Sequence, residues 1–251
     1  GETSELVEGV TEKALLIRAR EPYLGAHPLL DRERDIPAHA VPVTNDQAGN
    51  IQYIDIEKLD HISRDMDFNV YVVALPGDFV SVSSILVYVD KPVSTKTRCA
   101  VLGAFIIGHE RNFEQDPRFG LCVLAEIAAR ALSAAVNDYG TAIDIINRGV
   151  RLMTKYAQEE RHAGVKHERI WVPPITVAQL FSDIFAPILR DEGGIMAIDV
   201  RLMKAFDALG KLDSDQFRAE ARKYSRQCYE HAAGTLLLDE DKEALKALML
   251  D

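Results

Sequence analysis

Charged and amide side chains that could bind an anion or orient a substrate crowd one segment of the chain. It reads RNFEQDPRFGLCVLAEIAARALSAAVNDYGT over residues 111–141. A guanidinium beside carboxylates can hold an anionic ligand, but it can equally form an ion-pair network inside a protein. The candidate ligand-binding residues are Arg111, Gln115, Asp116, Arg130, Ser133, Asn137, Asp138 and Thr141.

The helix predicted to begin at Pro117 determines whether the charged residues of this segment need partners. Its residues are apolar nearly all round, which is typical of a buried helix, and Glu126 and Arg130 lie four residues apart on one face. Buried charges need partners, which Arg111 and Asp116 could supply. The sequence leaves a structural ion-pair network and a ligand or catalytic site both open, and it favours the network.

The SAAVNDYGTA stretch predicts a corner between two helices. Asn137 tolerates the left-handed conformation that ends a helix, and Asp138 can cap the next one. Ser133 and Thr141 would lie at the same corner. Capping explains most of this pattern, and orientation of a ligand or water by Asn137 and Asp138 is the alternative.

Metal and cofactor motifs are missing from the sequence. His109 stands beside Glu110, and His162 and His167 flank a glycine turn, but no HExxH or Cys/His spacing suits zinc. Three scattered cysteines indicate reduced thiols rather than disulfides. There is no Walker A loop, GxGxxG or GxSxG. We therefore expect no metal, no cofactor and no catalytic residue that can be assigned.

Composition limits the classes of partner. The chain has 251 residues, 47% of them hydrophobic, and a net charge of -10. That charge argues against nucleic acid as a partner. The longest apolar run, residues 100–108, is far shorter than the roughly 20 residues that span a bilayer, and the acidic start GETSELVEG has no signal-peptide character.

The first half of the chain changes from helical to strand-like periodicity. Residues 4–20 predict an amphipathic helix, and a proline-containing connection follows it. Alternating apolar residues then predict strands in AHAVPV, NIQYIDI, FNVYVVAL and SSILVYVD, with a short helix over 57–64. We expect residues 38–110 to form a small β-barrel or barrel-sandwich-like subdomain.

The second half is predicted to be helical. Asp116 and Pro117 begin a helix that runs to about Val136, and the next spans about 140–161. RIWVPP is predicted to be a short extended link. The TVAQ sequence at 176–179 is a capping box for a helix that ends at the glycines 193–194, and helices follow over 195–212, 214–233 and 239–250.

These elements predict an α+β fold in which a small β-barrel-like subdomain is followed by an α-helical bundle. The predicted divisions are an N-terminal, membrane-proximal helix and linker over residues 1–37, the β-barrel-like subdomain over 38–110, and the α-helical subdomain over 111–251.

The segment over 111–144 resembles the signature of the bacterial DUF2254 predicted membrane proteins. The upstream stretch GNIQYIDIEKLDHISRDMDFNVYVVALPGDFV is similar to that family as well, and the likeness is strong over residues 49–144. The candidate residues from Arg111 to Thr141 match the signature, as do Phe119 and Gly120. Asn112, Ala134-Ala135 and Tyr139 depart from it, which makes the predicted helix corner less rigid than in the family.

The resemblance implies a transmembrane bundle before a region like this one, in a bacterial inner-membrane protein without an assigned activity. We expect this chain to be the soluble region, on the cytoplasmic side, and to act in assembly or in ligand sensing. Expected partners are further copies in a homo-oligomer, the transmembrane region and a small-molecule ligand. The alternative is a hydrolase- or transferase-like enzyme that uses Arg111, Asp116 and Arg130 with His109.

Overall fold

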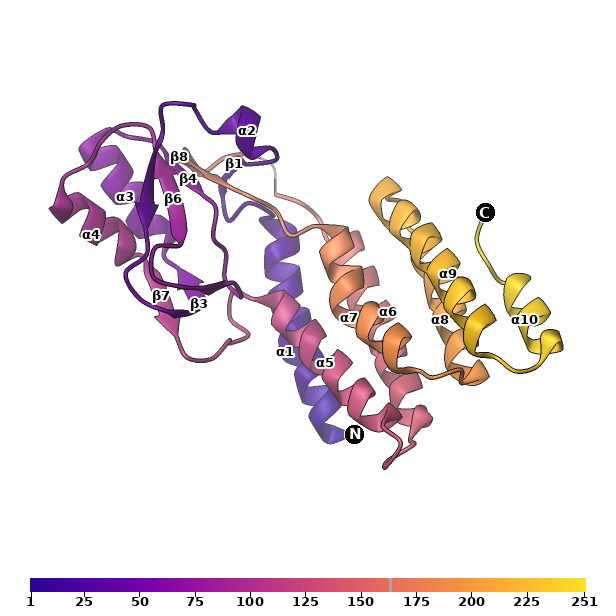
Figure 1. Ribbon diagram of the computed structural model, residues 1–251. Helices are drawn as coiled ribbons and strands as arrows, with labels where there is room; N and C mark the ends of the chain where they lie inside the picture. Colours follow the sequence, from indigo (N-terminus) through magenta and orange to yellow (C-terminus); the bar gives the residue numbers. More distant parts are fainter. Residues whose placement is uncertain (163) are drawn as a thin grey trace. The chain divides into compact units, whose positions relative to one another are not determined.

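The chain forms two compact units whose boundaries fall inside two of its helices. The structure is a computed structural model that describes residues 1–162 and 164–251 (Figure 1). Unit 1 comprises residues 1–16, 120–159 and 176–251, and unit 2 comprises 17–119 and 160–175. Each unit is therefore built from segments that are distant in sequence. The predicted three-part division of the chain stays a prediction.

Unit 1 is helical. It takes the first part of α1 (Glu2–Arg20) and most of α5 (Pro117–Leu132). The other helices of unit 1 are α6 (Tyr139–Gln158), α7 (Val177–Asp191), α8 (Met196–Gly210), α9 (Asp215–Thr235) and α10 (Asp239–Lys246).

Local capping signals place these helices where the sequence predicted them. Asp138 begins α6 by accepting from the N–H of Thr141, and Thr176 and Gln179 form the predicted capping box of α7. An aromatic cluster fills the core behind them: the Phe181 ring lies 5.4 Å from that of Phe185. Phe206, Phe217 and Tyr224 pack around the same ring. Burial of these rings holds α7, α8 and α9 together.

Unit 2 is a mixed assembly of short strands and helices. Its helices are α2 (Arg32–Asp35), α3 (Ile56–Met66) and α4 (Thr95–Leu102). Its strands are β1 (Ala26–Pro28), β2 (Val41–Thr44), β3 (Gly49–Ile54), β4 (Val70–Val72), β5 (Phe79–Val80), β6 (Ile85–Val89), β7 (Phe105–Gly108) and β8 (His167–Val172).

The strands form two sheets. The larger has the order β1-β8-β4-β6-β2, in which β8 runs parallel to both β1 and β4 and the other pairs are antiparallel. The smaller is an antiparallel sheet of β5, β3 and β7. Within the described residues neither sheet closes, so the α+β class is confirmed but the predicted β-barrel is not.

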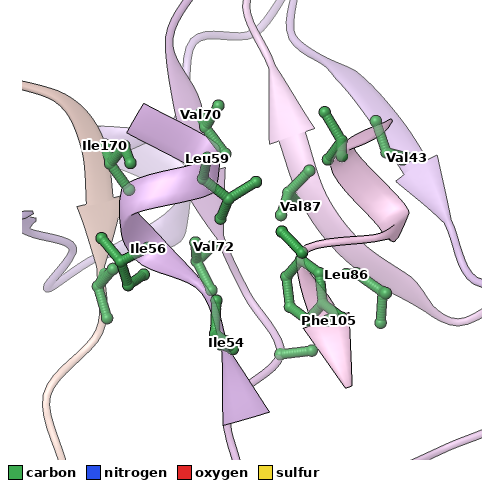
Figure 2. Close-up of a cluster of buried hydrophobic side chains, with 14 of the residues drawn as sticks. Val43, Ile54, Ile56, Leu59, Val70, Val72, Leu86, Val87, Phe105 and Ile170 are labelled. Carbon is green, nitrogen blue, oxygen red and sulfur yellow. The ribbon is translucent and has the colours of Figure 1, made fainter. Parts of the chain in front are cut away.

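A single apolar cluster connects both sheets to α3. Val70, Val72 and Val87 of the larger sheet and Ile54 of the smaller one are fully buried, and Leu59 of α3 packs among them (Figure 2). Ile170 of β8 joins the cluster as well. β4 is buried at all three positions, as expected for a strand covered on both faces.

Two expectations about secondary structure are corrected. The predicted extended link RIWVPP supplies part of β8, an interior strand of the larger sheet that lies between β1 and β4. Helix α5 ends at Leu132 rather than near Val136. None of the helices in the described part of the chain combines the length and the apolar character needed to cross a bilayer.

Candidate functional site

The eight residues predicted from sequence divide between the two units. Arg111, Gln115 and Asp116 belong to unit 2, and Arg130, Ser133, Asn137, Asp138 and Thr141 belong to unit 1. Asp116 immediately precedes α5 and Arg130 lies in its last turn, and a helix of 16 residues is about 24 Å long. The two ends therefore need separate interpretations.

Arg111 and Asp116 form a bidentate ion pair at the start of α5. The Arg111 Nε and Nη2 atoms lie 2.8 and 2.9 Å from the two carboxylate oxygens of Asp116, which is 2% exposed. The N–H of Phe119 donates to the same carboxylate. Burial raises the pKa of Asp116 above its ordinary value, and the Arg111 guanidinium offsets this only in part. The predicted cap is confirmed, and its carboxylate is sealed from solvent.

The neighbouring turn packs directly on this carboxylate. Gly77 has a φ of +95°, and a Cβ built there would lie 2.6 Å from Asp116 Oδ2. Gln115 makes two hydrogen bonds to one residue: its Oε1 accepts from the N–H of Ile54, and its Nε2 donates to the carbonyl of Ile54. The segment thus ties the end of β3 to the 75–78 turn, which is a structural role.

Glu126 and Arg130 are exposed, which corrects the expectation that they are buried. Their side chains are 67% and 81% exposed, and their closest approach is 3.9 Å. Helix α5 is apolar on most sides, but this i,i+4 pair marks its solvent-facing stripe. Arg130 therefore makes a weak surface ion pair.

The remaining candidates cap the corner between α5 and α6. Asn137 has a φ of +50°, as predicted for a helix-ending residue, and Ser133 Oγ donates to the carbonyl of Arg130. The Thr141 hydroxyl and N–H both donate to the Asp138 carboxylate, which lowers the pKa of Asp138. These bonds are local, and they account for the polar residues of this stretch.

A polar groove in unit 2, which the sequence interpretation missed, has the better geometry for a ligand. It lies between α3 and β8 and has a volume of about 680 Å³, within the usual range for small-molecule sites. Its lining is entirely charged or imidazole: Glu57, Asp60, His61, Arg64, Lys166, His167, Glu168 and Arg169.

Asp60 and His167 form the floor of the groove. Asp60 Oδ2 lies 2.9 Å from Arg64 Nη2 and 3.5 Å from His167 Nδ1, and the Asp60 and His167 side chains are only 12% and 15% exposed. His167 Nδ1 is buried and makes no hydrogen bond within the described residues. Gly25, with a φ of +81°, accepts the N–H of His167, and a Cβ there would lie 3.2 Å from the imidazole. The ring is therefore held in place beneath the groove.

The basic side chains on the rim are held by acidic partners outside the groove. Lys166 pairs with Glu21, and Arg169 Nη2 lies 2.7 Å from Asp67 Oδ1. The Lys166 ammonium is the main cause of the lowered pKa of Glu21. These partners fix the cations in position while more than half of Lys166 stays exposed.

The sequence carried one signal for this groove. Residues 57, 60, 61 and 64 recur at i, i+3, i+4 and i+7, which predicts a polar face on one helix. The strand that completes the groove had no comparable signal. In the described residues no group of three His, Cys, Asp or Glu side chains could hold a metal ion.

Comparison with known proteins confirms the family that the sequence resembles. Residues 1–208 match the family described as "Predicted membrane protein (DUF2254)". Uncharacterized proteins of Mycobacterium bovis and Mycobacterium tuberculosis are 29% identical over 150 residues, which is 55% of this chain and 28% of each relative. This chain therefore matches only about a quarter of their length. No solved structure matches. With most of its length matched, the chain belongs to the DUF2254 family of predicted membrane proteins.

Proposed function

We propose that unit 2 is a ligand-binding module of a membrane protein, and that a small organic anion binds in the α3–β8 groove. The observation that carries the proposal is the groove itself, a cavity of about 680 Å³ with eight charged or imidazole side chains. Arg64, Lys166 and Arg169 supply the positive charge. Guanidinium and ammonium groups are the side chains that bind carboxylates and phosphates most strongly.

Three carboxylates and three cations line the groove, so individual hydrogen-bond donors rather than a net positive charge would bind an anion there. Asp60, the buried carboxylate, is already paired with Arg64, while the two histidines offer further donors. The Arg64 side chain is 65% exposed, so its guanidinium can donate to a ligand while it pairs with Asp60.

Binding suits the groove better than covalent catalysis. Asp60 beside His167 resembles the acid–base part of a catalytic site. However, no Ser, Thr or Cys that could act as a nucleophile lines the groove within the described residues. The enzyme alternative built on Arg111, Asp116 and Arg130 has less support, because the Asp116 carboxylate is sealed and Arg130 is an exposed side chain.

Isothermal titration with inorganic phosphate, citrate and glycerol phosphate tests the proposal. We expect one of these anions to bind, and the Arg64→Ala variant to bind it at least tenfold more weakly. Lys96→Ala is the matched control, because Lys96 is an exposed cation of unit 2 outside the groove. Equal weakening by both variants would show that the effect is general electrostatics and would contradict the site.

Assembly and location complete the proposal. We retain a homo-oligomer at the inner membrane, with this region on the cytoplasmic side. Leu6 and Val10, 69% and 36% exposed, lie four residues apart on α1 and support self-association. Light scattering of the wild-type chain and of Leu6→Glu tests the oligomer. A topology reporter fused to this region within a full-length family member tests the side of the membrane.

A further inference from the structure

The turn between α7 and α8 contains a buried carboxylate that caps a helix from outside it. Glu192 is fully buried, and its Oε2 accepts from the N–H groups of Gly194 and Ile195, at 3.0 and 2.9 Å. Ile195, the N-cap residue of α8, forms no side-chain cap of its own. Glu192 therefore provides the hydrogen bonds that the start of α8 requires.

A second carboxyl lies beside it. Asp199, in the first turn of α8, is also fully buried and is within hydrogen-bonding reach of Glu192. Its Oδ1 lies 3.8 Å from Cys228 Sγ of α9, and its Oδ2 accepts no hydrogen bond from the described residues. Two acceptor-only carboxylates would repel here, whereas a proton on Asp199 could be donated to Glu192.

One imidazole of α9 faces the pair. His231 Nε2 lies 3.0 Å from Glu192 Oε1, an electrostatic contact rather than an aligned hydrogen bond, and the His231 side chain is 33% exposed. The turn is also pressed against the end of α9, since a Cβ on Gly194 would lie 3.0 Å from the Thr235 carbonyl oxygen. The corner thus joins α7, α8 and α9. Of the titratable side chains named at this corner, only that of His231 reaches solvent.

The surroundings favour one shared proton. Burial first, and then the Glu192 charge, raise the pKa of Asp199 to about 7, and burial raises the pKa of Glu192 as well. Burial also raises the pKa of the Cys228 thiol, which stays protonated. Helices α6 and α10 pack against α8 but add no group to those that act on Asp199. His231 is the imidazole that opposes the negative charge.

We propose that the Glu192–Asp199 pair is a proton-responsive element that holds the α7–α8–α9 corner closed in acid and lets it open as the pH rises to neutral. In the closed corner the buried Asp199 keeps its proton. In the open corner the carboxyl reaches water and releases that proton near its ordinary pKa, about 4. The proton passes from Asp199 to solvent, and no other bond changes.

Linkage fixes the sign and the range of the effect. A carboxyl whose pKa is raised in the closed state stabilises that state fully below the open-state pKa, and this stabilisation is lost as the pH rises through the closed-state pKa. The opening equilibrium therefore rises by up to about tenfold per pH unit between roughly 4 and 7, and it levels off above that range. Glu192 leaves the N–H groups of Gly194 and Ile195 when the corner opens.

Hydrogen exchange of the whole chain tests the proposal. After correction for intrinsic rates, we expect the amides of Gly194 and Ile195 to lose roughly fiftyfold of protection between pH 5 and 7. In Asp199→Asn the side-chain amide can donate to Glu192 at every pH, so most of the pH dependence of the Gly194 and Ile195 protection should disappear. Asp207→Asn is the control, because Asp207 lies on α8 and pairs at the surface with Lys211.

Two results would overturn the proposal. One is a wild-type slope that persists unchanged in Asp199→Asn. The other needs no variant, so it also applies if Asp199→Asn fails to fold. The side-chain carboxyl carbon of wild-type Asp199, followed by NMR, should titrate well above the pH range of an ordinary aspartate. A midpoint near pH 4 would contradict the shared proton. Because the corner lies in unit 1, neither result depends on ligand binding in the unit 2 groove.

Discussion

Replacement of Arg111 by alanine would leave the Asp116 carboxylate buried without its guanidinium. Asp116 is 2% exposed and receives two hydrogen bonds from Arg111, at 2.8 and 2.9 Å. Removing one partner of a buried ion pair costs about 3–5 kcal/mol. Arg111 is 27% exposed and Asp116 keeps the N–H of Phe119, so water and the cap recover part of this. We expect a loss of about 2–4 kcal/mol in the free energy of unfolding at pH 7.

Urea denaturation at pH 7, followed by circular dichroism, measures this loss. Arg130→Ala is the matched control, because its 81% exposed side chain is 3.9 Å from an exposed Glu126 and should cost less than about 0.5 kcal/mol. An Arg111→Ala variant within about 1 kcal/mol of wild type would refute the reasoning. So would an Arg130→Ala variant that loses as much as Arg111→Ala.

The cost of Arg111→Ala should also depend on pH. Burial already raises the pKa of Asp116, and loss of Arg111 raises it further. A carboxyl with a raised pKa favours the folded state in acid, and this contribution is lost as the pH rises through the folded-state pKa. Because the folded-state pKa of Asp116 is higher in the variant, the variant loses more of this stabilisation than the wild type does, and the loss continues to a higher pH. The two proteins should therefore be closest in stability near pH 4 and diverge toward pH 7.

Further predictions concern glycines and a helix–helix ion pair. Gly77→Ala should cost several kcal/mol in denaturant melts, because its Cβ would meet Asp116 Oδ2 at 2.6 Å and its φ is +95°. Gly9→Ala, where nothing lies within 4 Å of the added Cβ in the middle of α1, should instead stabilise unit 1 by roughly 0.5–1 kcal/mol. Glu8→Gln should cost about 1–2 kcal/mol, less in high salt, because Glu8 is only 15% exposed and pairs with Arg148 of α6. A loss that does not change with salt would contradict the ion-pair explanation.

Most helices and the predicted caps could be inferred from the sequence. The Asp116 cap, the left-handed Asn137, the Asp138 cap and the Thr176–Gln179 capping box all form as predicted. Each depends on residues within about one helical turn of one another, so the residue types alone are informative. The family likeness over the same segment is confirmed for the same kind of reason, since it rests on the order of residues along the chain.

The errors concern residues whose neighbours are distant in the sequence. Arg130 was expected to be buried because α5 is rich in apolar residues, but only packing decides which stripe of such a helix faces solvent. The predicted barrel used only strands from residues 38–110. Instead β8, which follows α6, pairs with β1 and β4 in a sheet that does not close within the described residues.

The candidate groove shows the same limit. Its α3 side could be inferred from the polar spacing of residues 57–64, whereas Lys166 and His167 reach it only because β8 enters the sheet beside β4. Residue order was enough to predict most of the helices, their caps, the α+β class and the family. The burial of Asp116, the exposure of Arg130, the groove and the Glu192–Asp199 pair became visible only once the chain was folded. Burial and charge proximity depend on which distant segments pack together, and local residue patterns do not encode that.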